Sequence, residues 1–307
     1  MSQMNLSLLQ QAVSDIKNDL EYAIKTATYG SASYRNGQIA KEALIRSSTL
    51  IMRLHEVVKQ SLVAELETAN RSHSIYPPVG FKGPELKITG YIKAKNQDVV
   101  VLFDNDKPQP EPVAGGPLDG TIDPIGKIQS ERSIVIGVRS QLGSVNKNFD
   151  TLMERAFAET LNLRLRLPRL VMGEVYLLPV YEYDSEAMKT NIVKFQQGKV
   201  DIEKFIRTFF GISGRRWEEA FGEVYKYERS ALVLVDFRQN PPKLYLTLED
   251  LRADGLVSDR LQRFAGLSPQ NFATDILEIH RLRYMDPNNL TTDIEPASVH
   301  PIADHIA

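Results

Sequence analysis

The chain has 307 residues, of which 42% are hydrophobic and 25% are charged. These values are typical of a globular protein and exclude a fibrous or wholly disordered chain. The chain has no cysteine, which excludes a disulfide framework, a zinc finger, an iron–sulfur cluster and a cysteine nucleophile. Its 37 lysines and arginines nearly balance 39 acidic residues, for a net charge of −2, so a nucleic-acid partner would require a local basic patch.

The N-terminal residues 1–11 lack the basic stretch and following apolar stretch of a secretory signal. No apolar run in the chain approaches the roughly 20 residues that cross a membrane. We therefore expect a cytoplasmic protein with no membrane partner.

Two helical segments open the chain. Apolar residues recur at steps of three and four over residues 6–24 and again over 38–67, which indicates two amphipathic helices. A short polar break near Gly30 separates them. Residues 1–73 are therefore predicted to form an N-terminal helical hairpin.

The pattern changes over residues 74–285, where short apolar or alternating runs predict strands and longer amphipathic stretches predict helices. A proline- and glycine-rich loop at 104–126 interrupts the strands. This order predicts an α/β core with a mixed central sheet flanked by helices and a C-terminal helical region, followed by an extended or disordered tail at 286–307. The predicted strands are 86–92, 98–103, 133–139, 171–180 and a pair at 231–237 and 243–246, and the predicted helices include 149–167 and a segment at 201–227 that is broken at 211–214.

Polar residues mark the ends of two of these strands. Asp98 begins one apolar strand, and Arg139 and Gln141 stand where the next one ends. If the two strands form a hairpin around the intervening loop, these polar ends converge. A carboxylate that holds a divalent ion, beside a cation that offsets phosphate charge, suits metal-assisted phosphodiester hydrolysis. A solvated strand end is the alternative interpretation of the same residues.

Four short segments in this region resemble a known family. They are 96–101 (NQDVVV), 134–143 (IVIGVRSQLG), 146–149 (NKNF) and 154–159 (ERAFAE). Their order resembles the core of the PD-(D/E)xK nucleases, and most of all the XhoI-type restriction endonucleases. In that family an acid before a strand is followed by I-E-F-K-S-Q-x-G, an asparagine-rich stretch and an acidic helix. The resemblance covers residues 93–163 and implies a restriction-endonuclease-like fold.

Two positions depart from the family pattern. Gly137 stands at the second acid, and Arg139 stands at the lysine. Glycine offers no side-chain ligand, and a guanidinium stays protonated and cannot act as a base. Either another acid has taken over the role, or the site has lost catalysis and retains DNA binding. Glu131 is the first candidate because it precedes the same strand, and the others are Asp119, Asp123 and Glu42 on the second helix.

Basic residues near these motifs are candidates for phosphate contacts. Some follow the strands and helix of the resemblance, and two lie beside Trp217, which would allow stacking. The predicted DNA-binding residues are Lys93, Lys95, Lys147, Arg155, Arg215 and Arg216.

The resemblance implies a type II-like restriction endonuclease that hydrolyses DNA phosphodiester bonds with Mg²⁺, or with Mn²⁺, as a homodimer on double-stranded DNA. Asp98, Glu131 and Glu42 are the expected metal ligands. Arg139 would stabilise developing charge, and Gln141 would orient water or phosphate. The alternative is a catalytically inactive nuclease-fold protein that binds DNA or regulates a partner. A scaffold without any nucleic-acid role is the third hypothesis.

Overall fold

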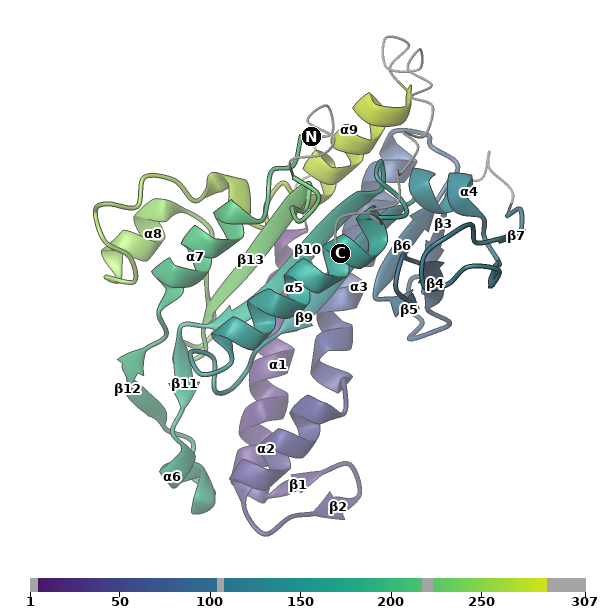
Figure 1. The fold of residues 1–307 in the computed structure, drawn as a ribbon. Coiled ribbons are helices and arrows are strands. Elements are labelled where there is room, and N and C mark those ends of the chain that lie inside the picture. The colour runs from purple at the N-terminus through teal and green to yellow at the C-terminus, as the bar shows by residue number, and fades with distance from the viewer. Residues whose placement is uncertain (1–4, 104–107, 217–222, 286–307) are drawn as a thin grey trace, which may run out of the picture.

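A six-stranded mixed sheet forms the centre of the molecule (Figure 1). The structure is a computed structural model that describes residues 5–103, 108–216 and 223–285, so the predicted tail at 286–307 lies outside the described residues. The strand order is β14-β13-β10-β9-β6-β3. In that order the strands are Lys243–Tyr245, Arg229–Asp236, Val171–Pro179, Ile134–Ser140, Val99–Leu102 and Ser74–Tyr76.

The sheet combines a parallel part with antiparallel edges. β9, β10 and β13 are parallel, and helices α5 (Phe149–Arg164) and α7 (Ile202–Gly211) connect them. Such connections are needed because parallel neighbours run in the same direction. β6 is antiparallel to β9, with Val99 opposite Ile136, which confirms the predicted hairpin of these two strands. β13 and β14 also pair as predicted.

Helices cover both faces of the sheet (Figure 1). Helices α1 (Leu6–Thr26), α3 (Thr49–Thr68) and α9 (Phe272–Met285) pack on one face. Helices α5 and α7 pack on the other. This mixed sheet with flanking helices confirms the predicted α/β class.

Strand side chains point alternately to the two faces. Val99 and Ile136 therefore pack in the core beneath α1 and α3. Val100, Val135 and Met172 pack in the core beneath α5 and α7. The N-terminal helices thus share one hydrophobic core with the sheet.

The predicted second helix, 38–67, is in fact two helices. Two residues, Ser47 and Ser48, separate helix α2 (Gly37–Arg46) from α3. The Ser47 hydroxyl donates to the Leu44 carbonyl at 2.7 Å, and Ser48 has a left-handed backbone with φ of 63°. Hydroxyl side chains that bond nearby backbone groups compete with helical hydrogen bonds, which explains the break.

The helical segment predicted at 201–227 ends at its predicted break, and the helix predicted after the break is not found in the described residues. α7 ends at Gly211, and the described residues 212–216 and 223–227 are not helical. The helix at 149–167 is confirmed by α5, which is shorter by three residues at its C-terminal end.

Smaller elements surround the sheet, and no helix in the described ranges is long and apolar enough to span a membrane. Two two-stranded pairs, β1-β2 and β11-β12, were not predicted, and two others, β4-β5 and β7-β8, build the hairpin before Asp98 and part of the proline-rich loop. These elements are β1 (Thr28–Tyr29), β2 (Ala32–Ser33), β4 (Leu86–Thr89), β5 (Ala94–Gln97), β7 (Glu111–Pro112), β8 (Ile122–Asp123), α4 (Lys127–Arg132), β11 (Tyr181–Tyr183), α6 (Ser185–Lys189), β12 (Phe195–Lys199), α8 (Leu248–Ala253) and a 3₁₀ turn at Ala265–Leu267.

Candidate functional site

Charged side chains converge on the sheet face that α5 covers. Asp98 immediately precedes β6 and shares the face of Val100, and Arg139 shares the face of Val135. Glu174 lies two residues after Met172 on β10 and therefore shares its face. We define the Glu174 cluster as these three residues together with Lys95 of β5 and Glu159 of α5.

Glu174 occupies the space that a side chain at position 137 would need. Gly137 and Glu174 are directly paired between β9 and β10. A Cβ atom at position 137 would collide with Oε2 of Glu174. Although Gly137 has no carboxylate of its own, Glu174 of the neighbouring strand β10 places one where a side chain at position 137 would lie.

The Glu174 carboxylate is buried and has few partners. Glu174 is 1% exposed, and its oxygens make no hydrogen bond of good geometry to a described residue, although the nearby Tyr227 hydroxyl, against the effect of burial, lowers the pKa of this carboxyl. Arg139 Nε lies 3.3 Å from its Oε1 and is an ion-pair partner. Asp98 is half-buried, and its Oδ2 accepts a hydrogen bond of 2.8 Å from the Val138 backbone N–H, which fixes this carboxylate against β9.

Glu159 holds both cations of the cluster. Its Oε1 lies 2.6 Å from Lys95 Nζ, and its Oε2 is ion-paired with Arg139. The Lys95 side chain is 41% exposed, whereas Glu159 is 11% exposed. The Lys95 side of the cluster is therefore the more open to solvent of the two.

The pKa values in this cluster are shifted. Burial raises the pKa of the Glu174 carboxyl to about 7, against the opposing effect of Arg139. Burial, and then the nearby charge of Arg139, lowers the pKa of the Lys95 ammonium. Both shifts move a group toward neutral pH, as is common at catalytic sites.

The donor set suits a hard divalent cation. Within the described residues no group of three or more His, Cys, Asp or Glu side chains is placed to hold a metal ion. Mg²⁺, however, is commonly held by one or two carboxylates, with waters and substrate phosphates completing its shell. Besides burial, the charge of Asp98 raises the pKa of the Glu174 carboxyl, so the two carboxylates lie near each other and are the candidates for such a pair.

The other acids proposed as metal ligands lie elsewhere. Glu131 accepts a hydrogen bond of 2.8 Å from the Arg169 backbone, beyond the start of β9. Glu42 pairs with Arg46 on the opposite side of the sheet, in α2. Neither has a described contact with Asp98. Asp119 accepts from the Gly115 backbone, and buried Asp123 lies 2.7 Å from Arg166.

Gln141 and three of the predicted DNA-binding lysines and arginines lie outside the Glu174 cluster. Gln141 donates to the Gly143 carbonyl within its own loop. Lys93, Lys147 and Arg155 are exposed. Lys93 lies on the turn before β5, and Arg155 lies on α5.

The burial of Arg215 contradicts the prediction that this residue contacts DNA. It is 5% exposed, and its Nη1 lies 3.2 Å from Oε1 of Glu228, so its guanidinium does not face solvent. Arg164 and Arg283 bind the same carboxylate, and we call these four residues the Glu228 cluster. Arg216 is exposed, whereas Trp217 lies outside the described residues.

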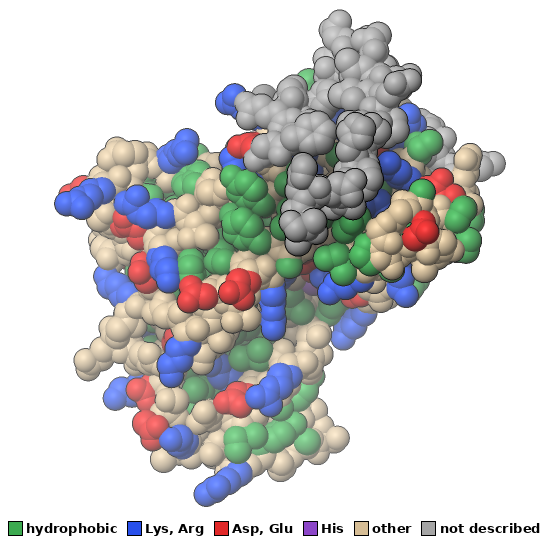
Figure 2. All heavy atoms as spheres, viewed as in Figure 1, with side chains coloured by type: hydrophobic (Ala, Val, Ile, Leu, Met, Phe, Trp, Pro, Cys, Tyr) green, Lys and Arg blue, Asp and Glu red, His purple; other side chains and the backbone are tan. Residues whose placement is uncertain are grey.

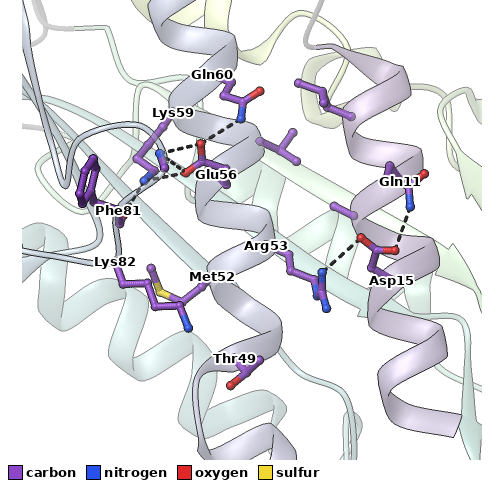
Figure 3. A pocket seen from close by; sticks show the side chains of 14 residues that line it. Gln11, Asp15, Thr49, Met52, Arg53, Glu56, Lys59, Gln60, Phe81 and Lys82 are labelled. Atoms are coloured by element: carbon purple, nitrogen blue, oxygen red, sulfur yellow. Dashed lines mark hydrogen bonds and ion pairs between the residues drawn. The ribbon is translucent and has the colours of Figure 1, made fainter. Parts of the chain in front are cut away.

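A cavity of about 490 Å³ between α1, α3 and residues 80–82 is a separate feature (Figure 3). Four of its charged groups form two ion pairs. Arg53 binds Asp15 at 3.2 Å, and Lys59 binds Glu56 at 2.8 Å. Lys59 also donates to the carbonyls of Pro78 and Phe81, so it anchors the chain that leads to β4.

Sequence reasoning missed Glu174 and Glu159. Glu174 is the single charged residue among the nine of β10, all of which are buried. A lone acid in such an apolar strand, together with a glycine at the family's acid position, was the available signal. Glu159 lies within the segment of the resemblance but had no assigned role.

Comparison with models of protein families, with curated proteins and with solved structures gives no match.

Proposed function

We propose that this protein is a divalent-metal-dependent DNA endonuclease of the restriction type, with a restriction-endonuclease-like core. One observation carries the proposal. The Glu174 carboxylate takes the place of a side chain at Gly137, on the face that also holds Asp98 and Arg139. The acid that the family pattern lacks in sequence is thereby supplied in space.

Asp98 and Glu174 would hold Mg²⁺ or Mn²⁺. The bound ion supplies Lewis-acid polarisation of the scissile phosphate. The Val138 N–H that binds Asp98 fixes one carboxylate, and the rigid core strand β10 fixes the other. Residues held in this way support precise placement of a substrate phosphate.

The two cations have different roles in this proposal. Arg139 stays charged and offsets the negative charge that develops on the phosphate. Burial and the nearby charge of Arg139 lower the pKa of the Lys95 ammonium, so this amine releases a proton more readily than an exposed lysine does. Lys95 thus takes the role of the lysine that Arg139 replaces, and Glu159 positions both side chains.

The proposed substrate is double-stranded DNA, cut by a homodimer whose two-fold symmetry matches a palindromic site. We place this activity in the cytoplasm as part of a restriction system. Light scattering on the purified chain tests the dimer.

Cleavage of mixed plasmid and genomic DNA, methylated and unmethylated, tests the activity. Wild-type protein with Mg²⁺ or Mn²⁺ is expected to give discrete fragments, and Asp98→Ala and Glu174→Gln are expected to give none. Glu131→Gln is the matched control and should cut like wild type.

The alternative is a nuclease-fold protein that binds DNA without cutting it. It is favoured by Arg139, which already pairs with both Glu159 and Glu174. Wild-type protein that binds duplex DNA but cuts none with either ion would support this alternative and overturn the nuclease.

A further inference from the structure

The hairpin of β4 and β5 leads directly into Asp98. Residues 86–97 contain the lysines Lys87, Lys93 and Lys95 and no acidic residue, although the whole chain has a net charge of −2. Lys and Arg side chains lie on the surface where β4 and β5 are labelled (Figures 1 and 2). The hairpin is therefore a local basic element joined to the candidate site.

The two faces of this hairpin differ. Lys87 pairs with Asn96 across the strands, and both side chains are exposed. Ile88 and Gln97 project to the other face and are buried. The hairpin thus rests on the protein with the face of Ile88 and Gln97, while Lys87 and Asn96 on the other face, and Lys93 in the turn, are exposed to solvent.

The tip of the hairpin is fixed by one buried side chain, Asn162 of α5. Its Oδ1 accepts from the backbone N–H groups of Ile92 at 2.9 Å and Lys93 at 3.1 Å, and its Nδ2 donates to the Lys93 carbonyl at 3.1 Å. Its backbone carbonyl accepts from Tyr91 at 2.6 Å. A Cβ atom at Gly90 would collide with Asn162, so the turn and the helix are in close contact.

This fixed turn presents apolar side chains to solvent. Ile92 is 59% exposed and Tyr91 is 39% exposed. Ordering a residue costs roughly 1–2 kcal/mol of backbone entropy, so an exposed turn held this firmly needs stabilisation from its hydrogen bonds. A preordered apolar tip binds a partner without that cost at the moment of binding.

The base of the hairpin is also anchored. Lys59 of α3, shown in Figure 3, is 1% exposed and donates to the carbonyls of Pro78 and Phe81 at 2.9 and 2.8 Å. The segment before β4 is therefore tied to α3, while the tip is tied to α5. The hairpin is held at both ends relative to Asp98.

We propose that the β4–β5 hairpin is the element that docks double-stranded DNA, with Lys87 and Lys93 on phosphates and Ile92 in a groove against the bases. Lysines supply the electrostatic part of DNA binding, and apolar side chains inserted at base steps are a known mode of groove contact. The proposal rests on the proposed function for its substrate, and it is tested by binding rather than by cleavage.

The experiment measures the affinity of the full chain for a fluorescein-labelled mixed-sequence duplex, by anisotropy in EDTA at several salt concentrations. Lys87→Gln with Lys93→Gln should reduce the slope of log affinity against log salt by about 1.8, the value for two lost phosphate contacts. Ile92→Ala should lower affinity by about tenfold, the size expected for a lost buried aliphatic contact, and leave the slope unchanged.

Matched controls lie on other surfaces. Ile192→Ala alters an isoleucine that is 56% exposed, and Lys25→Gln with Lys189→Gln removes two exposed lysines. If the hairpin variants and the controls bind alike, the docking proposal is overturned while cleavage by wild type still stands. If the hairpin variants bind DNA more weakly than wild type, and wild type cuts no DNA, the result supports the docking proposal and overturns the proposed nuclease. Wild type that binds no duplex overturns both.

Discussion

The Glu174 and Glu228 clusters lie side by side on one face of the sheet and differ in almost every electrostatic property. Glu228 has both oxygens bound, by Arg164, Arg215, Arg283 and the Met172 backbone N–H at 2.7 Å. Glu174 lies on β10, two residues after Met172, and its oxygens make no hydrogen bond of good geometry to a described residue.

The pKa values follow from these contacts. Burial alone would raise the pKa of Glu228, but Arg164 and Arg283 outweigh burial and lower it to about 2. Burial raises the pKa of Glu174 to about 7, because Arg139 is shared with Glu159 and only partly compensates. The comparison separates a carboxylate that three arginines compensate from one that a single shared arginine compensates only in part.

Removal of Glu228 should give the largest effect. Glu228→Gln leaves three buried arginines with no carboxylate among them. We expect a loss of about 3–5 kcal/mol in the free energy of unfolding, measured by urea denaturation. Glu186→Gln, which removes an exposed surface pair, should change it by less than about 1 kcal/mol. Equal stabilities would mean that the Glu228 cluster is not structural.

Glu174→Gln should act on activity instead. The amide keeps the shape and removes a metal-binding charge, so cleavage should fall by about 100-fold or more. The free energy of unfolding at pH 8 should not fall, because an ionised Glu174 is costly to bury. A stability loss as large as that of Glu228→Gln would make the two clusters equivalent.

The pH dependence of stability should differ in the same way. Because the pKa of Glu174 is raised in the folded state, its protonation contributes to the free energy of unfolding. This contribution is fully present below about pH 4.5 and is lost as pH rises to about 7. The wild-type free energy of unfolding should therefore decline over this range by on the order of 3 kcal/mol more than that of Glu174→Gln. Denaturation series at pH 5, 6, 7 and 8 measure this difference, and parallel curves would contradict the assignment.

The two cations of the Glu174 cluster should respond unequally. Lys95→Arg keeps the charge but removes the group that can exchange a proton, so cleavage should fall by about 10²-fold. Arg139→Lys keeps a charge and should cost less than about tenfold. The measurement is the cleavage rate of each variant relative to wild type across pH 6–9. A larger loss for Arg139→Lys than for Lys95→Arg would contradict the roles proposed for the two residues.

The smallest effects are expected at the acids outside both clusters. Glu131→Gln and Glu42→Gln should leave the cleavage rate within about twofold of wild type, because neither residue contacts Asp98 in the described structure. A strong loss in either variant, with the fold intact by circular dichroism, would move the metal site away from Glu174.

Much of the architecture was predictable because it depends on local pattern. The apolar runs at β6, β9, β10 and β13 are long enough to define strands, and a hairpin of β6 and β9 was an arrangement that these runs allowed. That hairpin predicted that Asp98 approaches β9. The helix break at Ser47 and Ser48 was missed because both residues occur in helices and turns alike.

Sequence by itself determined the α/β class and the long apolar strands β6, β9, β10 and β13, since these follow from side-chain periodicity. Only the tertiary structure decided which acid joins Asp98. Gly137 and Glu174 meet through the register of parallel strands that are separated in the chain by α5. The same nonlocal packing buries Arg215 against Glu228 and leaves its neighbour Arg216 exposed. Such pairings depend on how distant elements pack, and no local pattern encodes them.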